Sequence, residues 1–298
     1  MPQGQESSNL VVYIDFDNLA VGAREAGVRL NINLLLQRLL EKGKIIVKKA
    51  YADWSRYKDY MAELHEAGIE LIEIPAPRLS GKNSADIRLV VDAMELCHSK
   101  SHIDTFVIAS GDSDFSPLVA KLRENNKSVV GVGMRNSTAR LLICNCDEFI
   151  FYDDLIKQPA APATAGLDTV PAEKRAIFDM LLSTTRALLR EGRETLYSSL
   201  IKDAMKRKRP DFDEGNHGYA NFGELLEDAQ SHGLLSVNRD QHAGGTWVVT
   251  TVKSEKEGTP NGLQRRRKRA PRAARPRART ANARSRSATA SPKAPTAP

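Results

Sequence analysis

The sequence of 298 residues contains few cysteines and no long apolar run. Its three cysteines, Cys97, Cys144 and Cys146, are an odd number at no framework spacing, which excludes a disulfide scaffold and favours a reducing, cytoplasmic setting. Cys144 and Cys146 lack the second pair that a zinc site needs, so we interpret them as structural. No segment approaches the ~20 apolar residues of a membrane span, and the polar first residues do not resemble a signal peptide. We therefore expect no membrane partner.

Acidic residues are absent from the C-terminal segment. Residues 259–298 carry 12 of the 44 basic residues and none of the 37 acidic ones, so the rest of the chain has a net charge of about −5. Arginine mixed with Ala, Pro, Ser and Thr cannot build a core, and we expect residues 254–298 to form a disordered Arg-rich tail. Such a tail binds phosphates non-specifically and in a salt-dependent way, and its lack of aromatic residues argues against base stacking.

Apolar strand-like runs alternate with helical patterns through residues 8–156. The predicted strands are 9–14, 44–51, 69–74, 105–109, 128–132 and 148–152, and helical patterns at 34–40, 56–66, 84–94 and 115–124 separate them. This alternation predicts an α/β domain with a mostly parallel sheet and helices on both faces.

A second unit is predicted after a linker rich in Pro, Ala and Thr at 157–171. Helical patterns at 173–190, 196–208 and 221–231 precede two strand-like runs at 234–237 and 246–252. Three helices followed by a hairpin predict a small winged helix-turn-helix domain over 172–253.

Acidic residues occur where the predicted strands end. Asp15 ends the first strand, Asp86 opens the helix after the third, and Asp112 and Asp114 follow the fourth. Because the carboxyl ends of parallel strands meet at one edge of a sheet, we expect these four acids on a single rim. Carboxylates so close together repel one another unless a cation neutralises them.

Mg²⁺ or Mn²⁺ suits a site built from oxygen ligands. Such an ion polarises a phosphoryl oxygen and activates water for attack. In this hypothesis Asn18 and Ser110 supply neutral oxygens or orient the water.

Helix capping is the simplest alternative for each acid alone. Asp86 and Asp114 precede helical patterns, where aspartate is a favoured cap. Asp15 ends a strand and needs no cap, so we expect the set to be functional. Asp92, six residues beyond Asp86, is expected to point away into solvent, and the role of Asp17 stays open.

A phosphomonoesterase is a second alternative. Asp15-Phe-Asp17 is similar to the Asp-x-Asp motif of haloacid-dehalogenase-type phosphatases, and Gly111-Asp112 to their late Gly-Asp. Leu19 stands where those enzymes usually have Thr or Val, which counts against this interpretation.

Three segments together resemble the NYN domain. They are Ile14-Asp-Phe-Asp-Asn18, Gly81-Lys-Asn-Ser-Ala-Asp86 and Ser110-Gly-Asp-Ser-Asp-Phe115, and Cys146-Asp-Glu-Phe-Ile150 fits the closing strand of that family. The resemblance implies a PIN-like fold over about residues 8–156 and a metal-dependent ribonuclease. Its acids map onto Asp15, Asp86 and Asp112, with Asp114 and Asn18 in support. Lys82, four residues before Asp86 in the motif, is the expected phosphate contact.

The second unit resembles the LOTUS (OST-HTH) domain, a winged helix often joined to NYN domains and associated with RNA. The segments that carry this resemblance are Tyr197–Lys202, Arg209–Glu214 and Gly218–Leu226. The predicted helix 221–231 contains acids and no Lys or Arg, which disfavours readout of DNA in the major groove. The expected RNA contacts are instead the basic residues Lys206, Arg207, Lys208 and Arg209, although the unit also suits docking of a protein partner.

The sequence thus predicts a Mg²⁺- or Mn²⁺-dependent endoribonuclease whose second domain and tail tether RNA. The alternative is an RNA-binding adaptor without turnover, and a phosphomonoesterase is the least favoured hypothesis.

Overall fold

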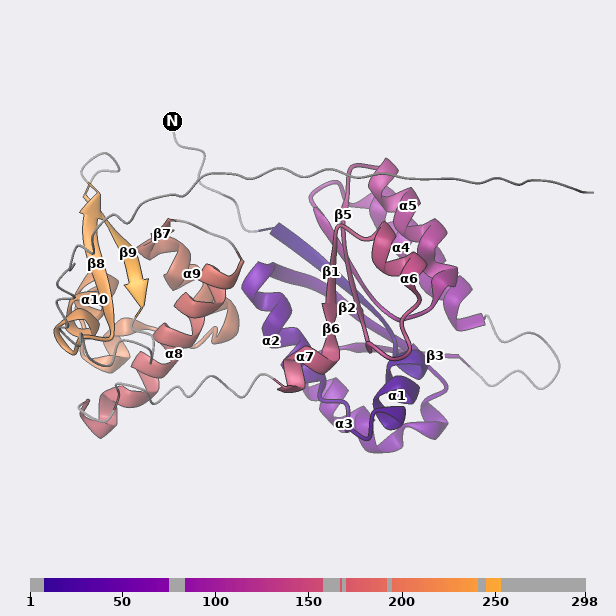
Figure 1. Cartoon of the computed structure of the whole chain (residues 1–298), viewed down its shortest axis with the longest axis horizontal. Coiled ribbons are helices and arrows are strands. Elements are labelled where there is room, and N and C mark those ends of the chain that lie inside the picture. Colours follow the sequence, from indigo (N-terminus) through magenta and orange to yellow (C-terminus); the bar gives the residue numbers. More distant parts are fainter. Residues whose placement is uncertain are drawn as a thin grey trace, which may run out of the picture. The chain divides into compact units, whose positions relative to one another are not determined.

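The computed structural model describes residues 8–74, 84–157, 167, 170–191, 195–240 and 245–252. Its larger sheet is six-stranded and parallel, in the order β3-β2-β1-β4-β5-β6 (Figure 1). The strands are β1 (Ser8–Asp15), β2 (Gly43–Ala52), β3 (Glu70–Glu73), β4 (Thr105–Ala109), β5 (Ser128–Gly133) and β6 (Glu148–Phe151). The α/β prediction is therefore confirmed for this part of the chain.

Helices cover both faces of this sheet (Figure 1). One face packs against α1 (Phe16–Glu25), α2 (Ile32–Lys42), α3 (Lys58–Glu66) and α7 (Tyr152–Lys157). The other packs against α4 (Ser84–Ser99), α5 (Ser116–Glu124) and α6 (Arg140–Asn145). Short 3-10 helices η1 (Trp54–Arg56) and η2 (Ser113–Phe115) follow β2 and β4. The sequence patterns did not predict α1, α6 or α7.

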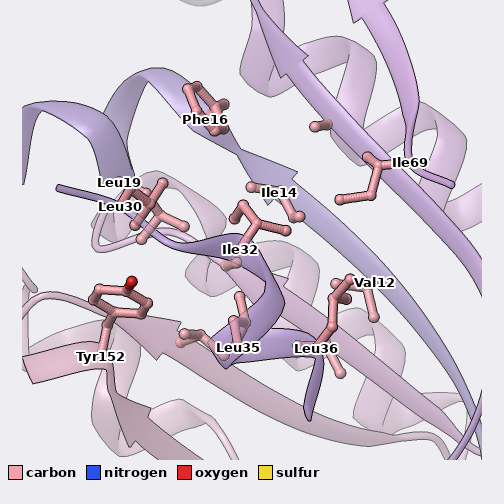
Figure 2. Packing of buried hydrophobic residues seen from close by; sticks show 14 of the residues in the cluster. Val12, Ile14, Phe16, Leu19, Leu30, Ile32, Leu35, Leu36, Ile69 and Tyr152 are labelled. Atoms are coloured by element: carbon pink, nitrogen blue, oxygen red, sulfur yellow. The ribbon is translucent and has the colours of Figure 1, made fainter. Parts of the chain in front are cut away.

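The two cores follow from the alternation of side chains along β1. Val12 and Ile14 point to one face, where Figure 2 shows them beside Ile32 and Leu35 of α2. Tyr13, the neighbour of both, joins the opposite core. Each fully buried apolar side chain of this kind stabilises the fold by roughly 1.5–3 kcal/mol. Packing on both faces therefore fixes the end of β1, where the predicted site begins.

Residues 172–252 contain a second set of elements with a core of its own. They are α8 (Ala172–Arg190), β7 (Leu196–Tyr197), α9 (Ser198–Lys208), η3 (Glu214–His217), α10 (Phe222–Ser231), β8 (Leu235–Asp240) and β9 (Thr246–Val252). The three strands form an antiparallel sheet in the order β7-β9-β8. These are the helices and strands that the sequence predicts, with β7 and η3 in addition, and the winged-helix assignment stays a prediction.

Several predicted segments lie largely or wholly outside the described residues. They are most of the linker 157–171 and the tail 254–298, so the domain boundaries stay predictions. Within the described part of the chain, no helix is long and apolar enough to cross a membrane.

Candidate active site

Asp15 lies where β1 passes directly into α1. Only 6% of this residue is exposed. Its carboxylate accepts hydrogen bonds from the Ser110 hydroxyl at 2.8 Å and from the Asn18 N–H at 3.2 Å. The second bond makes Asp15 the N-cap of α1. The expectation that Asp15 needs no cap was therefore wrong, because a helix that was not predicted starts at the next residue.

The segment after β4 is tied to the segment after β1. The Gly111 N–H donates to Asn18 Oδ1 at 2.8 Å, and the Asp112 N–H donates to Ser110 Oγ at 3.1 Å. Asp112 in turn accepts from the Asp114 N–H at 3.0 Å and caps η2. Adjacent parallel strands thus deliver Asp15, Asp112 and Asp114 to one edge, as predicted.

Ser110 and Asn18 are hydrogen-bonded to the protein itself. Ser110 is fully buried, so its hydroxyl contacts Asp15 and the Asp112 N–H instead of a substrate. Asn18 uses its side-chain oxygen to hold Gly111. The structure therefore gives both residues a positioning role, and the expected contact of Asn18 with substrate or water stays a prediction.

Gly111 is required by a close approach of the chain. A Cβ atom here would lie 2.7 Å from the carbonyl oxygen of Ser137 and 3.0 Å from Thr138 Cα. The Ala139 N–H donates to the Gly111 carbonyl at 2.8 Å, which holds the segment before α6 against this turn. A larger residue would have to displace backbone atoms, so the sequence Ser110-Gly-Asp112 is sterically constrained.

The acids at this edge interact electrostatically. Burial raises the pKa of Asp15 to about 7, against the hydrogen bonds from Ser110 and Asn18, and nearby Asp86 and Asp17 raise it further. The pKa of Asp86, in the first turn of α4, is also raised, by burial and then by Asp112 and Asp114. Asp86 therefore joins the predicted cluster. Among the described residues, none forms an ion pair with Asp15, Asp86, Asp112 or Asp114.

Asp17 has partners of a different kind. It accepts hydrogen bonds from the Tyr57 hydroxyl at 2.6 Å and from Arg56 Nη1 at 2.9 Å. Both partners follow the end of β2, which neighbours β1 in the sheet. Arg56 and Tyr57 were not among the residues predicted from the sequence, although the rule that the carboxyl ends of parallel strands share one edge applies to them too.

The donor set suits a hard cation. All candidate ligands are carboxylate oxygens, and their mutual repulsion is what a divalent cation would relieve. Within the described residues no three His, Cys, Asp or Glu side chains are grouped closely enough to hold a metal. Mg²⁺, however, binds through one or two carboxylates plus waters, and Asp15 and Asp112 on adjacent strand ends fit that pattern.

Asp92 was expected in solvent, and that prediction was wrong. Its residue is 7% exposed, and its carboxylate accepts hydrogen bonds from Tyr51 at 2.8 Å, Arg88 at 2.9 Å and Lys49 at 3.1 Å. It does point away from Asp86, but toward β2, where Lys49 and Tyr51 lie. Asp92 is therefore a structural residue of the α4 packing.

A groove of about 710 Å³ adjoins the acids. Its lining includes Asp86, Ile87 and Val91 of α4, together with Asp114, Pro117 and Leu141. The apolar side chains Ile87, Val91 and Leu141 are all exposed. The groove thus leads from Asp86 and Asp114 over an uncharged surface.

The basic residues that were predicted to contact RNA differ in their partners within the protein. Lys82 lies outside the described residues. Arg209 pairs with Asp211 at 3.2 Å, Arg207 Nε donates to the carbonyl of Leu40, and Lys208 pairs with Glu41 at 3.0 Å. Lys206 is exposed and forms no ion pair with the described residues. Most of this cluster is therefore already engaged within the protein.

The NYN domain family model matches residues 9–154. The match spans all six strands of the parallel sheet and every candidate acid, and it confirms an NYN domain over this segment. NYN domains have a PIN-like, nuclease type of fold, and they suggest RNA as a substrate. The match favours this interpretation over the phosphomonoesterase. No family model covers the predicted LOTUS domain.

Two solved structures are similar in part. A protein of unknown function from Vibrio parahaemolyticus is 25% identical, with a TM-score of 0.46, over 51% of this chain and 98% of its own. The ORC1 protein of Aeropyrum pernix, solved in complex with DNA, is 14% identical, with a TM-score of 0.20, over 82% of this chain and 83% of its own. Both TM-scores are below 0.5, so neither likeness bears on function. No curated protein matches the chain.

Proposed function

We propose that the chain, whose residues 9–154 form an NYN domain, is a metal-dependent endoribonuclease that hydrolyses phosphodiester bonds. The observation that carries this proposal is the acidic cluster. Asp15, Asp86, Asp112 and Asp114 meet at the carboxyl edge of the parallel sheet, and the described residues give them no cationic partner. Uncompensated acids cost stability, and a bound divalent cation would reduce that cost.

Asp15 and Asp112 are the proposed direct ligands of Mg²⁺ or Mn²⁺, with Asp86 and Asp114 at the rim of the site. A divalent ion bound there would polarise a phosphoryl oxygen and lower the pKa of a bound water. Ser110 and Asn18 hold the two ligand-bearing segments together, which supports a shared site for the two carboxylates.

The second domain and the basic tail are proposed to tether RNA. Of the basic cluster on α9, Lys206 is the best placed, since it is exposed and has no ion pair with the described residues. Tethering through phosphates is sequence-independent and weakens steeply with salt. A cytoplasmic location is proposed from the cysteine content alone.

The test is cleavage of labelled single-stranded and structured RNAs by the full chain, with Mn²⁺, with Mg²⁺ or with EDTA. We expect internal cleavage that requires the metal and is lost in Asp112→Asn. RNA affinity, measured by filter binding in EDTA, should change less than about twofold, because phosphate contacts dominate affinity.

The matched control is Glu66→Gln, which removes one negative charge from an exposed position on α3. It should cleave like the unmodified chain. Cleavage that survives in Asp112→Asn, or that persists in EDTA, contradicts the proposed site.

An RNA-binding adaptor is the second candidate, and a specific observation favours it. Asp15 and Asp112 both cap helices, so each has a structural reason to be aspartate even without catalysis. RNA binding without cleavage of any tested RNA, equal in the unmodified chain and in Asp112→Asn, would identify the adaptor.

A further inference from the structure

A second pocket, of about 430 Å³, lies between α1 and α3. Its polar lining consists of two arginines and two tyrosines, Arg24, Arg29, Tyr57 and Tyr60. The chain turns back at Gly27, whose φ of +70° suits glycine, so that Arg24 at the end of α1 and Arg29 beyond it reach the same pocket. The volume lies within the range of small-ligand sites.

The charge of this Arg24/Arg29 pocket is opposite to that of the acidic cluster. No carboxylate belongs to its lining, and neither arginine forms an ion pair with the described residues. The Arg29 guanidinium lies 5.3 Å from the centre of the Tyr60 ring. Arginines beside tyrosine rings bind a phosphate through charge-assisted hydrogen bonds and offer a stacking surface to an unpaired base.

The pocket is joined to the acidic edge by an aromatic cluster. Phe16, the residue after Asp15, lies 5.2 Å from both the Tyr57 and the Tyr60 ring centres. The Tyr57 hydroxyl donates to Asp17, which contributes to the raised pKa of Asp15. Tyr57 thus lines the pocket and also contacts Asp17, two residues beyond Asp15, which places the pocket near the acidic edge.

We propose that the Arg24/Arg29 pocket binds a phosphate and an unpaired base of the RNA strand, next to the bond that is cleaved. This inference rests on the proposed function, because it identifies single-stranded RNA as the substrate class. A base that stacks on tyrosine or guanidinium must leave its duplex partner, so paired RNA should use the pocket poorly. Arg24 also complements the C-terminal end of the α1 dipole, whereas Arg29 lies beyond the helix.

The experiment compares Arg24→Ala/Arg29→Ala with Lys44→Ala/Lys100→Ala in the full chain. Both double variants remove two exposed positive charges, but Lys44 and Lys100 lie at the amino ends of the strands. We expect the arginine variant to raise the KM for a single-stranded oligouridylate about tenfold. Its kcat should stay near that of the unmodified chain. The lysine variant should change KM less than about twofold. Both variants keep the basic C-terminal tail, so its contribution to RNA binding is the same as in the unmodified chain and does not affect either KM ratio.

A second measurement separates this inference from the proposed function. The affinity for a fluorescein-labelled oligouridylate, measured by anisotropy in EDTA, needs no cleavage. Suppose that the chain never cleaves RNA, but that the arginine variant alone binds the oligouridylate about tenfold more weakly. The Arg24/Arg29 pocket would then be supported as an RNA-binding site, whereas the nuclease proposal would be contradicted.

Other outcomes overturn the pocket. One is cleavage and binding that are equal in the arginine variant and the unmodified chain. Another is an equal loss in the two double variants, which would indicate general charge only. A third is that uridine monophosphate binds as tightly as the oligouridylate, which would make this a free-nucleotide site.

Discussion

Asp15 and Asp92 are equally buried carboxylates in very different surroundings. Their residues are 6% and 7% exposed. Asp92 is contacted by two cations, Lys49 and Arg88, and by the Tyr51 hydroxyl. Among the described residues, two neutral groups donate hydrogen bonds to Asp15, and the charges that shift its pKa belong to other acids.

The two pKa values therefore shift in opposite directions. Burial raises the pKa of Asp92, but the hydrogen bonds from Tyr51, Lys49 and Arg88 outweigh it and hold the pKa below its usual range. Burial raises the pKa of Asp15 to about 7, and its two hydrogen bonds do not compensate. Burial alone thus does not identify a functional acid. The difference lies in whether the fold supplies the compensating positive charge or leaves it to a ligand.

The largest expected effect is on catalysis in Asp15→Asn. Asparagine has a single side-chain oxygen, which can still accept from the Asn18 N–H and cap α1, but it places an NH2 group where Ser110 donates and lacks the charge that a cation needs. We expect kcat for RNA cleavage to fall at least about a hundredfold, as when other preorganised charge-stabilising groups are removed. The free energy of unfolding in urea should change by less than about 1 kcal/mol. Retained cleavage, or a large loss of stability, would show that Asp15 has a structural role like that of Asp92 and would contradict its proposed role in metal binding.

The same substitution at Asp92 should have the opposite effects: a loss of stability and no change in the rate of RNA cleavage. Asp92→Asn leaves Lys49 and Arg88 without their buried counter-charge, and because both cations are partly exposed, the loss of unfolding free energy should stay below the roughly 3–5 kcal/mol of a fully buried pair. The folded fraction should cleave RNA at the normal rate, since Asp92 points away from Asp86. Urea unfolding and an activity assay on the same samples measure both effects. A loss of kcat without a loss of stability would contradict the structural role.

The pH dependence of stability sharpens this contrast. Because the pKa of Asp92 is lower in the folded chain than its usual 3.8, its ion pairs stabilise the fold fully above that value. The contribution is lost as the pH falls through the folded pKa. The stability difference between the unmodified chain and Asp92→Asn should therefore be largest near about pH 7 and shrink below about pH 4. Urea unfolding of both proteins across this range provides the measurement, and a difference independent of pH would refute the ion pairs.

The parallel arrangement of the sheet and the edge at which its acids lie could be predicted from the sequence. Apolar runs that end at Asp15 and at Ala109 are unambiguous, and parallel strands bring their carboxyl ends together. Asp112 and Asp86 reached the same edge for that reason. Two kinds of information were enough to place the acids at one edge: the apolar patterns of the strands, and the rule that parallel strands have their carboxyl ends at the same edge of the sheet.

The local partners of these acids could not be predicted. The α1 helix contains Asn18 and Gly22, both poor helix formers, so nothing in the pattern indicated that Asp15 caps a helix. The helical position of Asp92 correctly turned it away from Asp86. What it meets there is set by the packing of α4 on β2, where Lys49 lies 43 positions away in the chain. Contacts of this kind depend on tertiary structure and leave no local signal.

Gly111→Ala tests whether the acidic edge depends on exact backbone placement. The added methyl group would lie 2.7 Å from the Ser137 carbonyl oxygen, so the backbone must shift. We expect the free energy of unfolding to fall by about 1–3 kcal/mol, as for other overpacked sites, with a decrease in kcat. Gly68→Ala is a useful contrast, because its Cβ would meet only the flexible end of the Lys48 side chain and its strain comes from the positive φ. If the two variants cleave RNA equally well, the tight turn at Gly111 is not needed for the site.

The smallest expected effect belongs to Ser110→Ala, which addresses the only side-chain hydroxyl that Asp15 contacts among the described residues. The substitution removes the donor to Asp15 Oδ2 and the acceptor of the Asp112 N–H, while the buried methylene remains packed. Of these two hydrogen bonds, the one to the Asp15 carboxylate corresponds to about 1.5 kcal/mol, or roughly tenfold in kcat. Ser110→Thr keeps the hydroxyl and should restore most of the rate if the larger side chain fits. Because Ser110 is fully buried, KM should not change, and a rise in KM with constant kcat would instead support a direct contact with RNA.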